Sequence, residues 1–171
     1  MEIGGSGGGM IDSVLRFFVE DQWNYQLIEP GSAVRAGYRG VHGTWICTAR
    51  AEAVSRDASG SRRFLFTAGM GMNIAPHQRA VVMEYLTRVN CGLPVGGFVM
   101  DLDTGDVRFK VGVDVPDGVL TIAMVRAAAY TCVQALDRYF PGLLAVIHGG
   151  LSPQAALARV VMQPVEGAAS R

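Results

Sequence analysis

The chain has 171 residues, of which half are hydrophobic and 18% are charged, so it fits one domain with a packed core and not a disordered protein. Lysine plus arginine and aspartate plus glutamate both number 15, so the chain lacks the basic charge typical of nucleic-acid or membrane-surface binding. Three scattered cysteines, without a CxxC pair, predict buried reduced thiols in a cytoplasmic protein and no disulfide framework.

The chain ends differ in composition from the interior. Residues 1–9 are rich in Gly and Ser and lack the basic and apolar regions of a signal peptide, so we expect a flexible linker or cloning scar. Residues 10–162 are predicted to form a single domain, and residues 163–171 a C-terminal tail. The most apolar stretch, residues 119–136, carries Arg126 and has a helical period, so no membrane span is predicted.

Hydrophobic periodicity predicts the elements of the first half of the domain. Apolar residues at helical spacing predict a helix over 11–21, and two short strands then flank a turn containing Pro and Gly. Two longer strands follow, joined by a polar loop, with Trp45 facing inward and Ile46 breaking the alternation. The four strands are expected at residues 25–28, 33–38, 43–54 and 62–74.

The second half is predicted to contain a helix, a hairpin and two more helices. Pro76 suits the first turn of a helix, and the hairpin turns at "DTGD", with Phe98, Met100 and Leu102 facing in. The long helix begins near the N-cap Thr121 and should kink or restart at Pro141. The last helix begins after the N-cap Ser152, with Pro153 in its first turn.

The element order is therefore α-β-β-β-β-α-β-β-α-α. Hairpin connections make the sheet mostly antiparallel, and strands with one apolar and one polar face need a layer of helices on one side only. The predicted class is α+β, with helices covering one face of the sheet.

Four phrases resemble the YbjN family, whose fold is like that of type III secretion chaperones. They are "WNYQLIEPGSAVRAGYRGVHGTW" (23–45), "RFLF" (63–66), "CGLPVGGFVMDLDTGDVRFKVGVDV" (91–115) and "DRYFPGLLAVIHGG" (137–150). The resemblance implies a bacterial, type III secretion chaperone-like fold that dimerises and holds segments of a partner. It also implies the family's usual label, a regulator of sensory transduction.

The sequence contains no convincing catalytic or cofactor motif. The Gly-rich stretches 69–73 and 92–97 lack the GK[ST] ending and a complete GxGxxG, so they are predicted to be turns or bulges. No GxSxG occurs outside the Gly/Ser-rich residues 1–9, and Cys91 is expected at a helix C-terminus, which disfavours a reactive thiolate. "DLDTGD" resembles a calcium loop, but its twelfth position, counted from Asp101, is Gly112 and not Glu. We therefore predict no enzyme activity, no cofactor and no metal.

Two groups of residues are candidates for contacts with a partner or ligand. Trp23 and Tyr25, at a helix–strand junction, either belong to the core or line a groove for an apolar side chain. The cations of the polar sheet face either pair with neighbouring carboxylates in water or belong to a binding or dimer face. These cations are Arg50, Arg63, Arg108 and Lys110.

Together these observations predict a non-catalytic protein-binding module with a chaperone-like or regulatory role, acting as a homodimer on a protein partner or client. Nucleic acid and membrane partners are not expected. The alternative is a small-molecule sensor with an apolar pocket between helices and sheet, lined by Trp23, Tyr25, Tyr85 and Tyr139.

Overall fold

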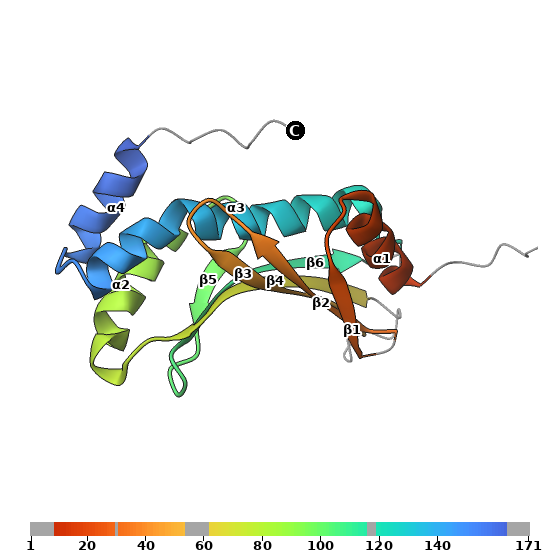
Figure 1. The fold of residues 1–171 in the computed structure, drawn as a ribbon, viewed down its shortest axis with the longest axis horizontal. Coiled ribbons are helices and arrows are strands. Elements are labelled where there is room, and N and C mark those ends of the chain that lie inside the picture. Colours follow the sequence, from red (N-terminus) through yellow and green to blue (C-terminus); the bar gives the residue numbers. More distant parts are fainter. Residues whose placement is uncertain (1–8, 30, 54–61, 116–118, 164–171) are drawn as a thin grey trace, which may run out of the picture.

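The computed structural model describes residues 9–29, 31–53, 62–115 and 119–163. Within them one antiparallel sheet of six strands has the order β1-β2-β3-β4-β6-β5 (Figure 1). The elements follow each other in the predicted order, which confirms the α+β class. They are α1 (Met10–Glu20), β1 (Tyr25–Glu29), β2 (Ala33–Arg39), β3 (Thr44–Ala53), β4 (Arg62–Asn73), the 3₁₀ turn η1 (Pro76–Gln78), α2 (Arg79–Asn90), β5 (Gly97–Met100), β6 (Asp106–Val115), α3 (Ile122–Ile147) and α4 (Pro153–Met162).

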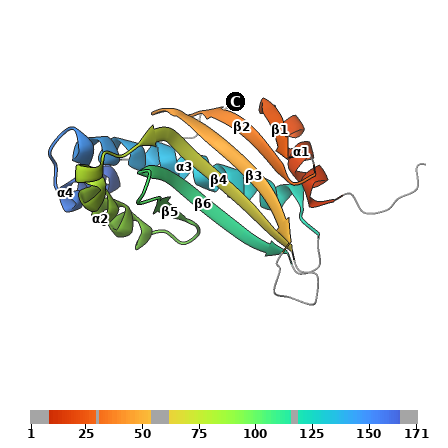
Figure 2. The same cartoon turned by 90° about the horizontal axis from the view of Figure 1, so that it is seen from below.

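The helices lie on one face of the sheet and at one end of it. Helix α3 crosses the sheet against β4 and β6, α1 packs beside α3, and α2 and α4 pack together near β5. Figure 2 shows the molecule turned by 90° and seen from below, where the strands lie in front of α3. The prediction that helices cover one side of the sheet is confirmed.

Side-chain alternation on the long strands separates a covered face from an open face. On β4, Phe64, Phe66 and Ala68 are buried under the helices. The register places Phe66 between Ala49 of β3 and Val111 of β6, so apolar side chains form continuous rows across the sheet. These rows supply the hydrophobic layer onto which α3 packs.

The end of β5 differs from the prediction. Leu102 was expected to face inward, but β5 ends at Met100 and Leu102 is 55% exposed. The carboxylate of Asp101 accepts hydrogen bonds from the backbone N–H groups of Asp103 and Thr104, at 2.8 and 3.1 Å. These two hydrogen bonds turn the chain immediately after the strand, so Leu102 lies in the turn and is not part of β5.

Helix α3 runs through Pro141 without the predicted restart. Proline has no N–H, so the carbonyl of Asp137, four residues earlier, lacks its helical donor. His42, in the loop between β2 and β3, places Nδ1 2.9 Å from that carbonyl oxygen. The Asp137 carboxylate also accepts hydrogen bonds from the backbone N–H groups of Val41 and His42, both at 3.2 Å. The contact between His42 and the Asp137 carbonyl thus takes the place of the helical hydrogen bond that Pro141 cannot donate.

The predicted helix starts are confirmed by side-chain caps. The Thr121 hydroxyl accepts a hydrogen bond from the N–H of Met124, and the Ser152 hydroxyl accepts one from the N–H of Ala155, each at 3.2 Å. Pro153 occupies the first turn of α4, as expected. The N-caps fix where α3 and α4 begin.

The cysteines do not all follow the prediction of burial. Cys47 and Cys132 are buried, and burial raises the pKa of the Cys47 thiol to about 12. Cys91 is exposed because it follows the last residue of α2, where the helix leaves the core. The prediction of a buried thiol is therefore wrong for Cys91, while its position at a helix C-terminus is confirmed.

Candidate binding surface

The structure brings four of the six candidate contact residues together. Arg50, Arg63, Arg108 and Lys110 occupy outward positions on β3, β4 and β6, on the face of the sheet that none of the described helices covers. Alternation along the strands predicted this grouping, because each of these residues occupies a position that alternates with the buried apolar positions of its strand. Trp23 lies elsewhere in the fold.

Trp23 and Tyr25 belong to an aromatic cluster at the α1 end of the molecule. Trp23 is only 8% exposed, with its ring centroid 5.5 Å from that of Phe17 and 4.7 Å from that of Tyr38. Tyr25 is 40% exposed and packs against Phe18 on the helix side of edge strand β1. Trp23 therefore offers little surface to a partner, whereas Tyr25 retains some.

The four aromatic residues predicted to line one pocket are split between two ends of the molecule. Tyr85 is buried on α2 and its hydroxyl donates a hydrogen bond to the carbonyl of Tyr139 at 2.8 Å. Helices α2 and α1 lie at opposite ends of the sheet (Figure 1). Trp23 and Tyr25 thus do not share a pocket with Tyr85 and Tyr139, and this part of the prediction is wrong.

We call the uncovered side of the sheet the open face. The strand register defines its members, which alternate with the buried residues of the covered face. They are Gln26 of β1; Ala33, Arg35, Gly37 and Arg39 of β2; Thr44, Ile46, Thr48, Arg50 and Glu52 of β3; Arg63, Leu65, Thr67 and Gly69 of β4; Asp106, Arg108, Lys110, Gly112 and Asp114 of β6; and Gly97 and Val99 of β5.

At one end of the open face the charges are paired. Arg50 donates to both carboxylate oxygens of Glu29, at 2.8 and 2.9 Å, and the hydrogen bond from Arg50 is the main cause of the lowered pKa of Glu29. Arg63 donates to Asp114 at 2.7 Å, and this bond lowers the pKa of Asp114. These cations are held by carboxylates of this chain, so they are less available to a partner.

Toward the other end positive charge is in excess. Arg35, Arg39 and Lys110 have no ion-pair partner among the described residues, and all three are exposed. Arg108 contacts the Asp106 carboxylate, two residues earlier on β6. This end therefore has a local positive charge although the whole chain is neutral.

Two large apolar side chains stand on the open face in the same cross-strand row. The row runs through Gly37, Ile46, Gly69, Arg108 and Val99, and Ile46 and Val99 are 51% and 47% exposed. A Cβ atom at Gly69 would lie 3.2 Å from Cγ of Arg108, so the glycine leaves room for the arginine side chain to lie along the sheet. The row thus carries an exposed apolar side chain at each end of the Gly69–Arg108 pair, and its glycine positions give it little relief, so a partner could cover it closely.

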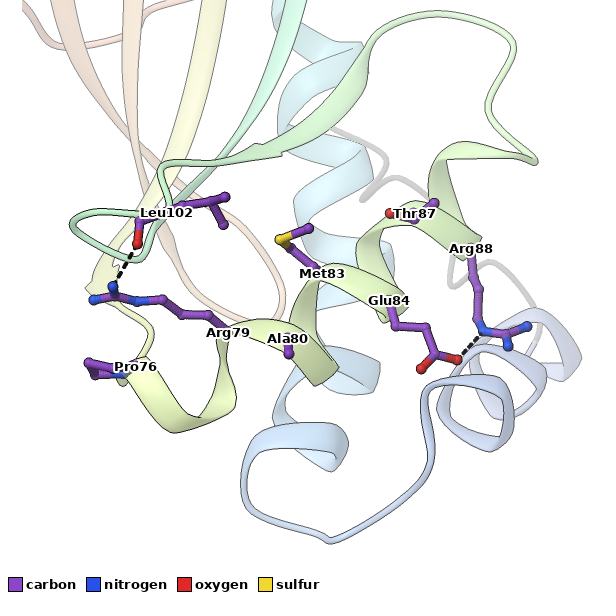
Figure 3. A pocket seen from close by; sticks show the side chains of 8 residues that line it. All are labelled: Pro76, Arg79, Ala80, Met83, Glu84, Thr87, Arg88 and Leu102. Carbon is purple, nitrogen blue, oxygen red and sulfur yellow. Dashed lines mark hydrogen bonds and ion pairs between the residues drawn. The ribbon is translucent and has the colours of Figure 1, made fainter.

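A second candidate surface, a groove, lies along α2 (Figure 3). Met83 and Leu102 approach it from α2 and from the turn after β5, in a groove of about 780 Å³. Arg79 closes one end by donating to the Leu102 carbonyl at 2.6 Å, and Arg88 pairs with Glu84 at 2.8 Å. Sequence reasoning missed this groove, because it depends on the early end of β5 that exposes Leu102.

The β5 edge beside this groove is closed to strand pairing at its centre. The Asn90 side chain accepts a hydrogen bond from the Phe98 N–H at 2.8 Å and donates one to the Phe98 carbonyl at 2.9 Å. The amide thus occupies the backbone groups that another strand would need. The opposite edge strand, β1, pairs only with β2 in the described part of the chain.

A model of the YbjN family, described as "Putative bacterial sensory transduction regulator", matches residues 11–145. The chain belongs to the YbjN family. The match spans every strand of the sheet and most of α3, so the open face lies wholly inside the part of this YbjN protein that defines the family. The family description is that of a regulator and names no reaction. No curated protein matched the chain.

The described residues of this YbjN protein contain no group of three or more His, Cys, Asp or Glu side chains placed to hold a metal ion. Nor is any helix within those residues both long and apolar enough to cross a membrane. Every buried side-chain nitrogen or oxygen in the described ranges has a hydrogen-bond partner. The polar groups that can still form hydrogen bonds or ion pairs with a partner are therefore exposed ones, among them the cations of the open face.

Proposed function

We propose that this YbjN protein is a non-catalytic cytoplasmic regulator that acts by binding another protein through its open face. The observation that supports this most is the row on which Ile46 and Val99 are exposed beside unpaired cations. Single exposed apolar residues are ordinary, but two in one cross-strand row, with Gly69 and the Arg108 side chain between them, give a partner two aligned apolar side chains to bury. Holding a partner segment in this way is a chaperone-like or regulatory action.

Affinity capture with matched variants tests the proposal. The protein is used as bait in native lysate in three forms: the parent, the Ile46→Ser/Val99→Ser double variant, and a Val19→Ser/Val161→Ser control. Val19 and Val161 are exposed on α1 and α4, away from the open face. Proteins retained by the parent and the control but lost from the first variant support the proposal. If every captured protein binds all three baits equally, the open face is not the docking site.

We also propose that the protein forms a homodimer. The unpaired edge of β1, with Leu27 exposed, supports this because an open strand edge can pair with another chain. Light scattering at tens of micromolar should give twice the 18.2 kDa chain mass. A monomer mass under those conditions would contradict the dimer without affecting the role of the open face.

A small-molecule sensor is the second candidate, and the α2 groove is the observation that favours it. Its volume lies within the range of ligand pockets, about 300–1,000 Å³, although its lining differs from the predicted one. A thermal-shift screen against metabolites tests it: a ligand that stabilises the parent but not a Met83→Asp variant would support a sensor. An absence of any stabilising ligand leaves protein binding as the function.

A further inference from the structure

We propose that the partner segment bound by the open face is an acidic amphipathic helix, whose apolar stripe covers the row from Ile46 to Val99 and whose carboxylates meet Arg35, Arg39 and Lys110. This inference rests on the proposed function and adds the chemistry of the partner. It is carried by the positions of the apolar and cationic side chains relative to one another.

The first step is the length of the apolar row. Ile46 is on β3 and Val99 is on β5, with β4 and β6 between them. Three strand spacings separate the two residues, about 14 Å. A helix rises 1.5 Å per residue, so about nine or ten residues, less than three turns, cover this distance. A short helical stripe can therefore contact Ile46 at one end and Val99 at the other.

The second step is the position of the cations on both sides of this row. Residues two apart on a strand share a face and lie about 7 Å apart. Arg35 and Lys110 belong to the neighbouring row on one side, with Thr48 and Thr67 between them. Arg39 belongs to the row on the other side. The two flanking rows are about 14 Å apart, which accommodates a helix about 10–12 Å wide including its side chains.

The third step is charge. The three flanking cations lack carboxylate partners among the described residues, whereas the cations at the other end of the face are paired within the chain. A partner with carboxylates beside an apolar stripe supplies what this end lacks, and opposite charge also orients the partner on approach. A second copy of the open face would bring its own Arg35, Arg39 and Lys110, and like charges would oppose that pairing.

Single-stranded nucleic acid is the other anionic partner to consider. Proteins that bind it on a sheet stack bases on exposed aromatic side chains. The open face, as far as the structure describes it, has no aromatic side chain, because the aromatic residues of these strands point toward the helices. The exposed apolar row also has no counterpart on a phosphate backbone, so the surface favours an acidic protein segment.

Fluorescence polarisation with defined probes tests this inference. One labelled helical peptide carries a leucine stripe flanked by glutamates, a second has glutamine at each glutamate, and a third probe is single-stranded RNA. The intact protein is compared with an Arg35→Glu/Lys110→Glu variant and with an Arg16→Glu/Arg159→Glu control of the same net charge. Arg16 and Arg159 are exposed on α1 and α4. Circular dichroism verifies that both variants are folded.

We expect the glutamate peptide to bind at least tenfold more tightly than the glutamine peptide, about 1.4 kcal/mol. The Arg35→Glu/Lys110→Glu variant should lose this preference and the control should keep it. Equal binding of the two peptides, equal binding by both variants, no binding of the glutamate peptide, or tighter binding of RNA each overturns the inference. If captured proteins depend on Ile46 and Val99 but tolerate Arg35→Glu/Lys110→Glu, the acidic partner is wrong while the proposed function stands.

Discussion

On β4, Phe66 and Thr67 are neighbours in sequence but face opposite sides of the sheet. Phe66 is fully buried between Ala49 and Val111, under the layer that contains α3, whereas Thr67 lies on the open face between Thr48 and Lys110. The same alternation thus produces a covered face that is packed and an open face that is polar and cationic at one end. A single strand pattern determines both the stability of the domain and the chemistry that it presents to a partner.

Truncating one residue on each face should give the largest difference in the free energy of unfolding between the two faces. Phe66→Ala leaves a cavity in the core and should lower the free energy of unfolding by about 3–5 kcal/mol. Thr67→Ala, one position along β4, should change it by no more than about 0.5 kcal/mol. Urea denaturation measures both. Similar losses in the two variants would show that the open face is also packed against something, contrary to the structure.

The covered face also depends on the anchor at Asp137. Asp137→Ala removes the acceptor of the Val41 and His42 N–H groups and of the Trp45 indole N–H, which lies 3.2 Å from the carboxylate. We expect a loss of about 1–3 kcal/mol in unfolding free energy, because these donors lose their partner. Gln134→Ala, at an exposed position on the same helix, is the control. An unchanged stability in Asp137→Ala would mean that water replaces the carboxylate at no cost.

Stability should fall in acid because of an ion pair that joins α1 to α3. Hydrogen bonds from Arg126 hold the pKa of the Asp21 carboxyl below its usual value. A depressed folded-state pKa gives stability that is complete above the unfolded pKa, about 4, and is lost as the pH falls through the folded pKa. Asp21→Asn should therefore be less stable than the parent at neutral pH and flatten the pH dependence below about 4. Equal acid sensitivity in parent and variant would contradict this assignment.

Thiol labelling distinguishes the buried cysteines of the covered face from the exposed cysteine after α2 without changing stability. Cys47 and Cys132 point into the covered core, and burial raises the pKa of both thiols, whereas Cys91 is exposed after α2. Iodoacetamide should add a single group to the folded protein, at Cys91, and three groups in urea. Peptide mass spectrometry locates the adducts. Modification of Cys47 in the native protein as fast as Cys91 would show that the covered face opens readily.

Much of the sheet follows from local pattern. Alternation of apolar residues predicted β3 and β4 to within one residue at each end, and it predicted that Ile46 points away from Trp45. Such patterns suffice because the side-chain period of a strand is a local property. The insertion of β6 between β4 and β5 could not be predicted in this way, because it depends on contacts between distant segments.

The features that sequence reasoning missed depend on such distant contacts. Pro141 remains within a continuous helix because His42, about 95 residues away, reaches the freed carbonyl. The division of the open face into paired and unpaired cations depends on register, which decides that Arg50 meets Glu29 while Arg35 meets no carboxylate of the described residues. Arg35 and Arg39 could have been added to the candidate site from the alternation of β2, because they occupy the exposed positions that alternate with buried Val34 and Ala36.

Methyl NMR on the glutamate peptide complex tests the central claim, that the open face is the docking surface, most directly. Signals from the Ile46 δ1 and Val99 γ methyl groups report on the open face, that of Met83 on the α2 groove, and that of Leu27 on the β1 edge. On addition of the peptide, the Ile46 and Val99 signals should shift while those of Met83 and Leu27 stay in place. Shifts confined to Met83 or Leu27, with Ile46 and Val99 unaffected, would contradict the account.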